Sequence, residues 1–168
     1  RPGHPDAANA AAVIASIETA VAAVCDGEAA AVVTNPIAKS VLYQAGFTHP
    51  GHTEFLAALA ERHMPGRRYH PVMMLVSNAL RVVPLTVHIP ISAVPAAINR
   101  PLIVATVQVM AAALAAEFGI AKPRIAVAGL NPHAGEAGSI GEEDRDVIAP
   151  AVAELRAAGH LVTGPLSA

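Results

Sequence analysis

The chain has 168 residues, of which 54% are hydrophobic and 14% charged, so its composition excludes a globally disordered protein. The 11 basic and 13 acidic residues give a net charge of −2, without the basic stripe that a nucleic-acid partner needs. Polar residues break the longest apolar stretches before the roughly 20 positions that cross a bilayer. The sequence therefore predicts neither a nucleic-acid partner nor a membrane span.

Hydrophobic periodicity and turn residues predict helices alternating with short strands. Pro36 stands at the first position of one expected helix and Gly46 closes it, whereas Pro84 should weaken a strand and Pro150 should kink a helix. The expected elements are, in order, helix 8–27, strand 29–34, helix 36–46, helix 52–63, strand 71–77, strand 80–90, helix 101–119, strand 124–130, helix 142–159 and strand 161–165.

This alternation favours an α/β fold, because helices that connect buried strands cover both faces of a parallel sheet. We therefore expect residues 1–168 to form a single α/β domain, or a fragment of one, with three α/β/α layers and a mostly parallel sheet. The single cysteine, Cys25, cannot form an internal disulfide, which fits a cytoplasmic protein.

Polar residues follow three of the expected strands, at the ends where ligands gather in open α/β sheets. They are the segment 34–36, His88 and the segment 131–133. A fourth cluster, residues 51–54 (GHTE), opens a helix, whose unpaired N–H groups suit a phosphate or carboxylate. Lys39, near the start of its helix, is either a solvated lysine or a contact to such an anion.

His88 and His133 each follow directly on an apolar strand, and two interpretations stay open for them. Each ring either binds a metal ion or is buried and bonded to a backbone carbonyl. Two histidines are fewer than the three protein ligands of a usual catalytic zinc site. No H-E-x-x-H, C-x-x-C or P-loop motif completes the set, so spacing alone indicates a histidine-bearing cleft without a defined reaction.

Three stretches carry a family resemblance, namely TNPIAKSVLYQAGFTHPGHTEFLA, VVPLTVHIPI and GLNPHAGEAGSIGEEDRDVIAPAVAELRAAGHLVTGPLSA. In this order, over nearly the whole chain, they resemble the 4-hydroxythreonine-4-phosphate dehydrogenase family of pyridoxal phosphate biosynthesis. The resemblance implies oxidation of the 3-hydroxyl of 4-phosphohydroxy-L-threonine with NAD, followed by loss of carbon dioxide from the β-keto acid. It also implies a divalent metal, zinc or else magnesium or cobalt, that holds this hydroxyl.

The resemblance assigns roles to particular residues of this sequence. His88 and His133 match two of the family's three metal ligands, His52 and Thr53 match substrate contacts, and Lys39 matches a catalytic basic residue near the substrate. The third metal histidine belongs to a later motif of the type MYHDQG. The NAD contacts are expected mainly in that later part too, so no cofactor-binding residue is assigned here.

The resemblance further implies the middle section of a two-domain enzyme of the isocitrate and isopropylmalate dehydrogenase type. Such a section lacks the start of the first domain and the C-terminal NAD-binding part, and the complete enzyme is expected to be a homodimer acting on a small phosphorylated substrate. Two alternatives remain, which are a related dehydrogenase of phosphorylated threonate- or erythronate-type acids and a non-catalytic α/β assembly module.

Overall fold

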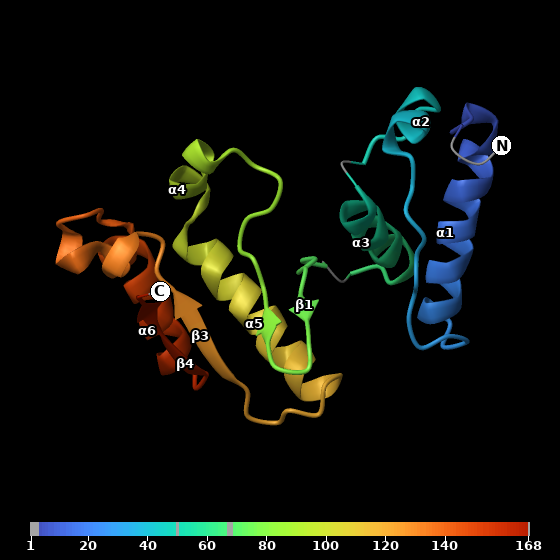
Figure 1. The fold of residues 1–168 in the computed structure, drawn as a ribbon. Coiled ribbons are helices and arrows are strands. Elements are labelled where there is room, and N and C mark those ends of the chain that lie inside the picture. Colours follow the sequence, from blue (N-terminus) through green and yellow to red (C-terminus); the bar gives the residue numbers. More distant parts are fainter. Residues whose placement is uncertain (1–3, 50, 67–68, 168) are drawn as a thin grey trace. The chain divides into compact units, whose positions relative to one another are not determined.

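A computed structural model describes residues 4–49, 51–66 and 69–167. Contacts between residues divide the chain into two compact units, Arg1–Pro71 and Val72–Ala168. Figure 1 shows their elements along the chain.

The first unit is helical in its described part. It comprises the 3₁₀ turn η1 (Ala7–Asn9) and the helices α1 (Ala10–Cys25), α2 (Lys39–Gln44) and α3 (His52–His63). The Asp6 side chain caps the start, because its carboxylate accepts a hydrogen bond of 2.9 Å from the Ala8 N–H. Helices α1 and α3 pack on each other around a core of Ala10, Ile17, Val21, Leu42, Phe47, Phe55 and Leu59.

The strand predicted over 29–34 is wrong, because this segment is irregular in the structure. Val33 is 96% exposed, and the described part of this unit contains no strand with which the segment could pair. An isolated strand leaves its backbone polar groups without ladder partners, so an apolar run alone does not make one. The next helix begins at Lys39, three residues later than the predicted start at Pro36.

The helical segment Ala7–Cys25 is long and apolar enough to cross a membrane by length and composition, with a mean hydropathy of 1.7. The bent pair Ile91–Ala97 and Arg100–Ala116 passes the same test as a broken span. The sequence analysis predicted no membrane span, because polar residues interrupt the longest apolar stretches. The structural test averages hydropathy over a window and tolerates such residues. Ile17 and Val21 face the core of their unit, although only 17% of the tested window is buried. One such helix is weak evidence of a span, because a core helix or a signal sequence passes the same test.

The second unit is mixed α/β. It contains β1 (Leu75–Val76), β2 (Arg81–Val82), η2 (Ile91–Ala93), α4 (Val94–Ala97), α5 (Arg100–Ala116), β3 (Arg124–Ala128), the turn η3 (Pro132–Gly138), the π-helical turn η4 (Asp144–Ile148), α6 (Ala149–Ala157) and β4 (Leu161–Leu166). Strands β3 and β4 are parallel, with Ile125 opposite Val162. The expectation of a mixed α/β fold with parallel strands is therefore confirmed, but the described strands form two separate pairs, β1 with β2 and β3 with β4.

The strands predicted over 71–77 and 80–90 shrink to the two-residue strands β1 and β2, which form an antiparallel hairpin. Ser77 holds its turn, because the Ser77 hydroxyl accepts hydrogen bonds from the N–H groups of Ala79 and Leu80. Pro84 has no N–H to donate to a ladder, which explains why β2 ends before it.

Helices α5 and α6 pack with β3 and β4 into the core of the second unit (Figure 1). Pro150 stands in the first turn of α6, so the predicted kink appears as a boundary between the π-helical turn and the α-helix. The buried core residues are Ile103, Val107, Ala111, Ile125, Ile148, Ala151, Val152, Leu155 and Val162.

Leu155→Ala should lower the free energy of unfolding of the second unit by about 2–5 kcal/mol, because Leu155 is 0% exposed and its loss leaves a cavity. The matched control is Leu161→Ala, because Leu161 is 53% exposed and its loss should cost less than about 1 kcal/mol. Urea unfolding followed by circular dichroism measures both, and equal losses would contradict this core assignment.

Candidate functional site

The turn after β3 has a left-handed backbone over five consecutive residues. Their φ angles are 52° at His133, 51° at Ala134, 76° at Gly135, 42° at Glu136 and 58° at Ala137. A left-handed conformation costs roughly 1–2 kcal/mol for each residue other than glycine. This turn therefore needs specific contacts to hold it.

The Asp144 carboxylate supplies contacts just ahead of this turn. Its side chain is 1% exposed, and its two oxygens accept hydrogen bonds of 2.8 Å from the Leu130 N–H and 2.9 Å from the Asn131 N–H. The Asn131 amide donates a further bond of 3.0 Å to Asp144 and one of 2.8 Å to Glu143. The bond from Asn131 holds the pKa of the Glu143 carboxyl below its ordinary value.

Two glycines allow the backbone to approach closely around Asp144. A Cβ at Gly129 would lie 2.8 Å from the Asp144 Oδ1 atom, and a Cβ at Gly135 would lie 2.7 Å from the carbonyl oxygen of Gly141. The φ of +76° at Gly135 also favours glycine. The glycines of the GLNPHAGEAGSIG stretch therefore make room for a folded turn.

His88 and His133 are both exposed, and both have a positive φ, of 58° and 52°. Their exposure excludes the interpretation of a core histidine sealed among apolar side chains. Both rings stay available to a ligand, as the metal interpretation requires. Among the described residues, no group of three or more His, Cys, Asp or Glu side chains comes together at a metal-binding distance.

The segments that lead to these two histidines line one groove of the second unit. Its volume is about 480 Å³, and its walls come from the 80–85 segment, α5 and β3 with the two residues after it. Leu85 and Leu130 both line it, three residues before His88 and three before His133. In Figure 1 the chain after β2 and strand β3 run in the same direction.

The start of α3 in the first unit carries the expected substrate residues. His52 begins the helix, and its Nε2 atom is buried without a hydrogen-bond partner. A Cβ placed on Gly51 would lie 3.2 Å from the Lys39 Nζ and 3.1 Å from a carboxylate oxygen of Glu54. Lys39 and Glu54 thus flank the backbone next to His52, while the Thr53 side chain is exposed.

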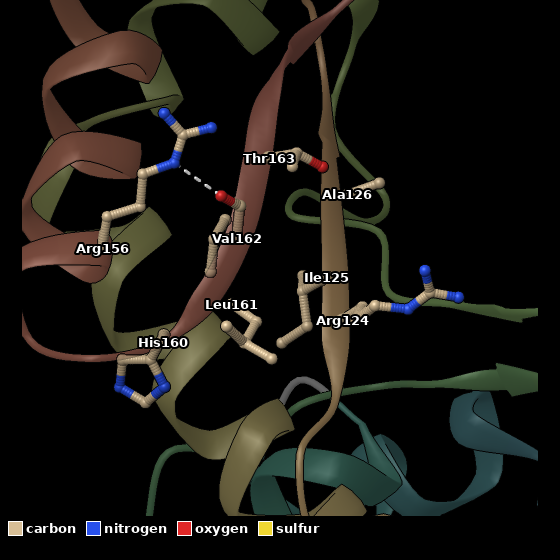
Figure 2. A pocket seen from close by; sticks show the side chains of 8 residues that line it. All are labelled: Arg124, Ile125, Ala126, Arg156, His160, Leu161, Val162 and Thr163. Atoms are coloured by element: carbon tan, nitrogen blue, oxygen red, sulfur yellow. Dashed lines mark hydrogen bonds between the residues drawn. The ribbon is translucent and has the colours of Figure 1, made fainter.

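A different hollow, of about 600 Å³, lies over the first halves of β3 and β4 (Figure 2). Figure 2 shows the guanidinium groups of Arg124 and Arg156 on different sides of it, so they do not converge on one anion. Arg156 is instead bonded to the Val162 carbonyl, at 2.7 Å. Ligands in α/β sheets gather at the carboxyl ends of strands, and this hollow lies at the other end.

Sequence reasoning singled out the two histidines as candidate ligands but gave Asp144 no role. The acids of residues 142–146 open the helix predicted over 142–159, where a negative charge complements the helix dipole. Nothing in the local pattern distinguishes Asp144, which is buried, from Asp146, which is exposed and paired with Arg145. His49, another histidine without a predicted role, packs against Phe47 and Phe55 with ring centroids 5.3 and 5.0 Å away.

Comparison with known proteins agrees with the resemblance seen in the sequence. The family described as pyridoxal phosphate biosynthetic protein PdxA matches residues 1–168. A 4-hydroxythreonine-4-phosphate dehydrogenase of Bradyrhizobium diazoefficiens is 58% identical over 99% of the chain, and one of Methylorubrum populi is 56% identical over the same share. The chain spans about half the length of these curated relatives, 48% in both cases.

Solved structures agree with the sequence comparisons. The 4-hydroxythreonine-4-phosphate dehydrogenase of Klebsiella pneumoniae is 39% identical, with a TM-score of 0.90 over 99% of this chain and 48% of that one. A terephthalate 1,2-cis-dihydrodiol dehydrogenase of Burkholderia xenovorans is 30% identical, with a TM-score of 0.71 over 99% of this chain and 52% of that one. The chain therefore belongs to the family of pyridoxal phosphate biosynthetic proteins PdxA.

Proposed function

We propose that the complete protein oxidises the 3-hydroxyl of 4-phosphohydroxy-L-threonine with NAD. The carbon that bears this hydroxyl gives a hydride to NAD, the hydroxyl gives up its proton, and the resulting β-keto acid loses carbon dioxide. The observation that carries the proposal is the 58% identity, over 99% of this chain, to a protein named for this dehydrogenase activity.

His52, Thr53 and Lys39 would form the substrate side of the site. The buried, unpartnered Nε2 of His52 supports this assignment, because a buried polar atom without a hydrogen bond costs free energy that a substrate oxygen or hydroxyl could recover. Lys39 lies beside the same stretch of backbone and would act as the catalytic basic residue, placing its positive charge next to an anionic group of the substrate. Thr53 would add a hydroxyl contact.

His88 and His133 would hold the divalent metal, which is zinc or else magnesium or cobalt. Two exposed imidazoles fit zinc or cobalt, because neutral histidine nitrogens are among their common ligands. When bound, such a cation polarises a hydroxyl oxygen and stabilises negative charge on it. We place the third ligand and the NAD contacts in the half of the curated relatives that this sequence does not span.

The architecture that we propose for the complete protein also rests on the family to which the chain belongs. It is a two-domain dehydrogenase of the isocitrate and isopropylmalate dehydrogenase type, built as a cytoplasmic homodimer. The parallel pair β3 and β4 and the helices packed on it would belong to one of the α/β layers.

A second candidate is a related dehydrogenase of phosphorylated threonate- or erythronate-type acids. The Burkholderia xenovorans structure supports this second candidate. It is named for a dehydrogenase of a different diol substrate, yet its TM-score to this chain is 0.71. Comparing NAD reduction by the complete protein with each phosphorylated acid separates the two. Faster turnover of a threonate or erythronate phosphate than of 4-phosphohydroxy-L-threonine would overturn the first proposal.

The isolated chain could instead act as a non-catalytic assembly module, since its described residues bring together no group of three metal ligands. Metal titration and gel filtration of the 168-residue chain test this. Tight binding of one zinc ion per chain would contradict it.

In the complete protein, His88→Ala and His133→Ala should each lower kcat by about 100-fold or more. The metal is expected to supply several kcal/mol of stabilisation, and each 1.4 kcal/mol is worth a factor of ten. Steady-state NAD reduction in the presence of the metal measures this loss. The matched control is His160→Ala, which alters a histidine at the opposite end of the sheet. Wild-type rates in both test variants would remove the ligand assignment.

His52→Ala should raise KM for the phosphorylated substrate by roughly 10-fold or more, because one hydrogen bond to a charged group is worth about 1.5–3 kcal/mol. His63→Ala is the control, since His63 is exposed at the far end of the same helix. Initial rates at varied substrate concentration measure both variants. An unchanged KM and kcat in His52→Ala would show that the orphaned nitrogen has no substrate role.

A further inference from the structure

The contacts of Asp144 differ from those of the other acids in its segment. It is 1% exposed, and three N–H donors from Leu130 and Asn131 surround its two oxygens at 2.8–3.0 Å. A buried carboxylate is tolerated when such donors satisfy it, and these charge-assisted bonds are stronger than bonds between neutral groups. Asp144 therefore fixes the end of β3 against the start of η4.

Asn131 connects the Asp144 hydrogen bonds to the turn that carries His133. Its carbonyl oxygen accepts a hydrogen bond of 3.0 Å from the Ala134 N–H, so the backbone closes around Pro132 and His133. Its amide is tied to Asp144 and Glu143 at the same time. The left-handed His133 thus lies inside a turn that the Ala134 N–H closes on the carbonyl of Asn131, a residue bonded to Asp144.

Further along, the turn closes on itself. The Ile140 N–H donates to the Gly135 carbonyl oxygen at 3.1 Å, and a Cβ on Gly135 would lie 3.5 Å from an Asp144 oxygen. The carboxylate is therefore in the interior of the loop, whereas the His133 side chain is on its exposed side. Asp144 does not share the surface on which a ligand would reach His133.

We propose that Asp144 is a positioning residue, whose buried carboxylate holds the left-handed turn so that His133 is presented to the metal. The inference rests on the proposed function, because it assigns His133 as a metal ligand. Asp144 acts through the backbone of residues 130–134 and makes no contact with the metal itself. Residues that orient a metal ligand without touching the metal typically change metal affinity or activity by about 10–100-fold.

The test compares Asp144→Asn with Asp146→Asn in the complete protein. Asparagine keeps the size of the side chain but replaces one acceptor oxygen with an N–H₂ donor, which would face the donors of Leu130 and Asn131. Asp146 provides the matched control, because the same change affects an exposed carboxylate two residues away that pairs with Arg145. The probe is Co²⁺ alone, titrated into metal-free protein, with its visible absorption bands as a second readout.

Asp144→Asn should weaken Co²⁺ binding by roughly 10–100-fold and change the visible bands, because residues that orient a ligand have effects of this size. Asp146→Asn should bind Co²⁺ within about twofold of the unsubstituted protein. A stabilising role alone would lower the melting temperature but leave the affinity and bands of the folded protein unchanged, which would overturn the inference.

Two further variants keep the result interpretable. His133→Ala separates the two claims, because normal Co²⁺ binding in that variant removes the proposed metal site and this inference with it. Weak Co²⁺ binding in His133→Ala together with normal Co²⁺ binding in Asp144→Asn would contradict the positioning role of Asp144 and leave the proposed metal site standing. Should Asp144→Asn fail to fold, Asp144→Glu decides, since it keeps a carboxylate that can accept from the N–H groups of Leu130 and Asn131 but moves it by one methylene. Several-fold weaker Co²⁺ binding in this variant supports the inference and unchanged binding overturns it.

Discussion

The geometry after β3 depends on one buried carboxylate that bonds to the backbone of the strand end. Asp144 accepts from the N–H groups of Leu130 and Asn131 and thereby joins the end of β3 to the start of η4. The five left-handed residues that follow would be costly without such support. The exposed position of His133 is a consequence of this interior contact, because the turn folds around Asp144 and leaves the imidazole on its outer side.

The two units contribute different chemistry to the proposed reaction. The first unit gathers Lys39 and the unpartnered ring of His52 at the start of α3, where an anionic substrate group would find donors. The second unit offers the imidazoles of His88 and His133 beyond the ends of two segments that line one groove.

Sequence reasoning succeeded where local chemistry decides structure. The helices α1, α3 and α5 and the strands β3 and β4 follow from apolar periodicity with glycine or proline at their ends. It failed for residues 29–34, where Val32 and Val33 suggest a strand but a strand also requires a partner that periodicity does not reveal. The role of Asp144 was equally hidden, because its donors are 13 and 14 residues away in the chain and come together only in the folded turn.

The most direct test of the metal assignment is an anomalous-scattering map of the complete protein crystallised with Zn²⁺ or Co²⁺. The account predicts one strong peak about 2.0–2.1 Å from a ring nitrogen of both His88 and His133, with the remaining ligand from a segment outside this sequence. A peak bound elsewhere, with these two imidazoles turned away from each other, would contradict it.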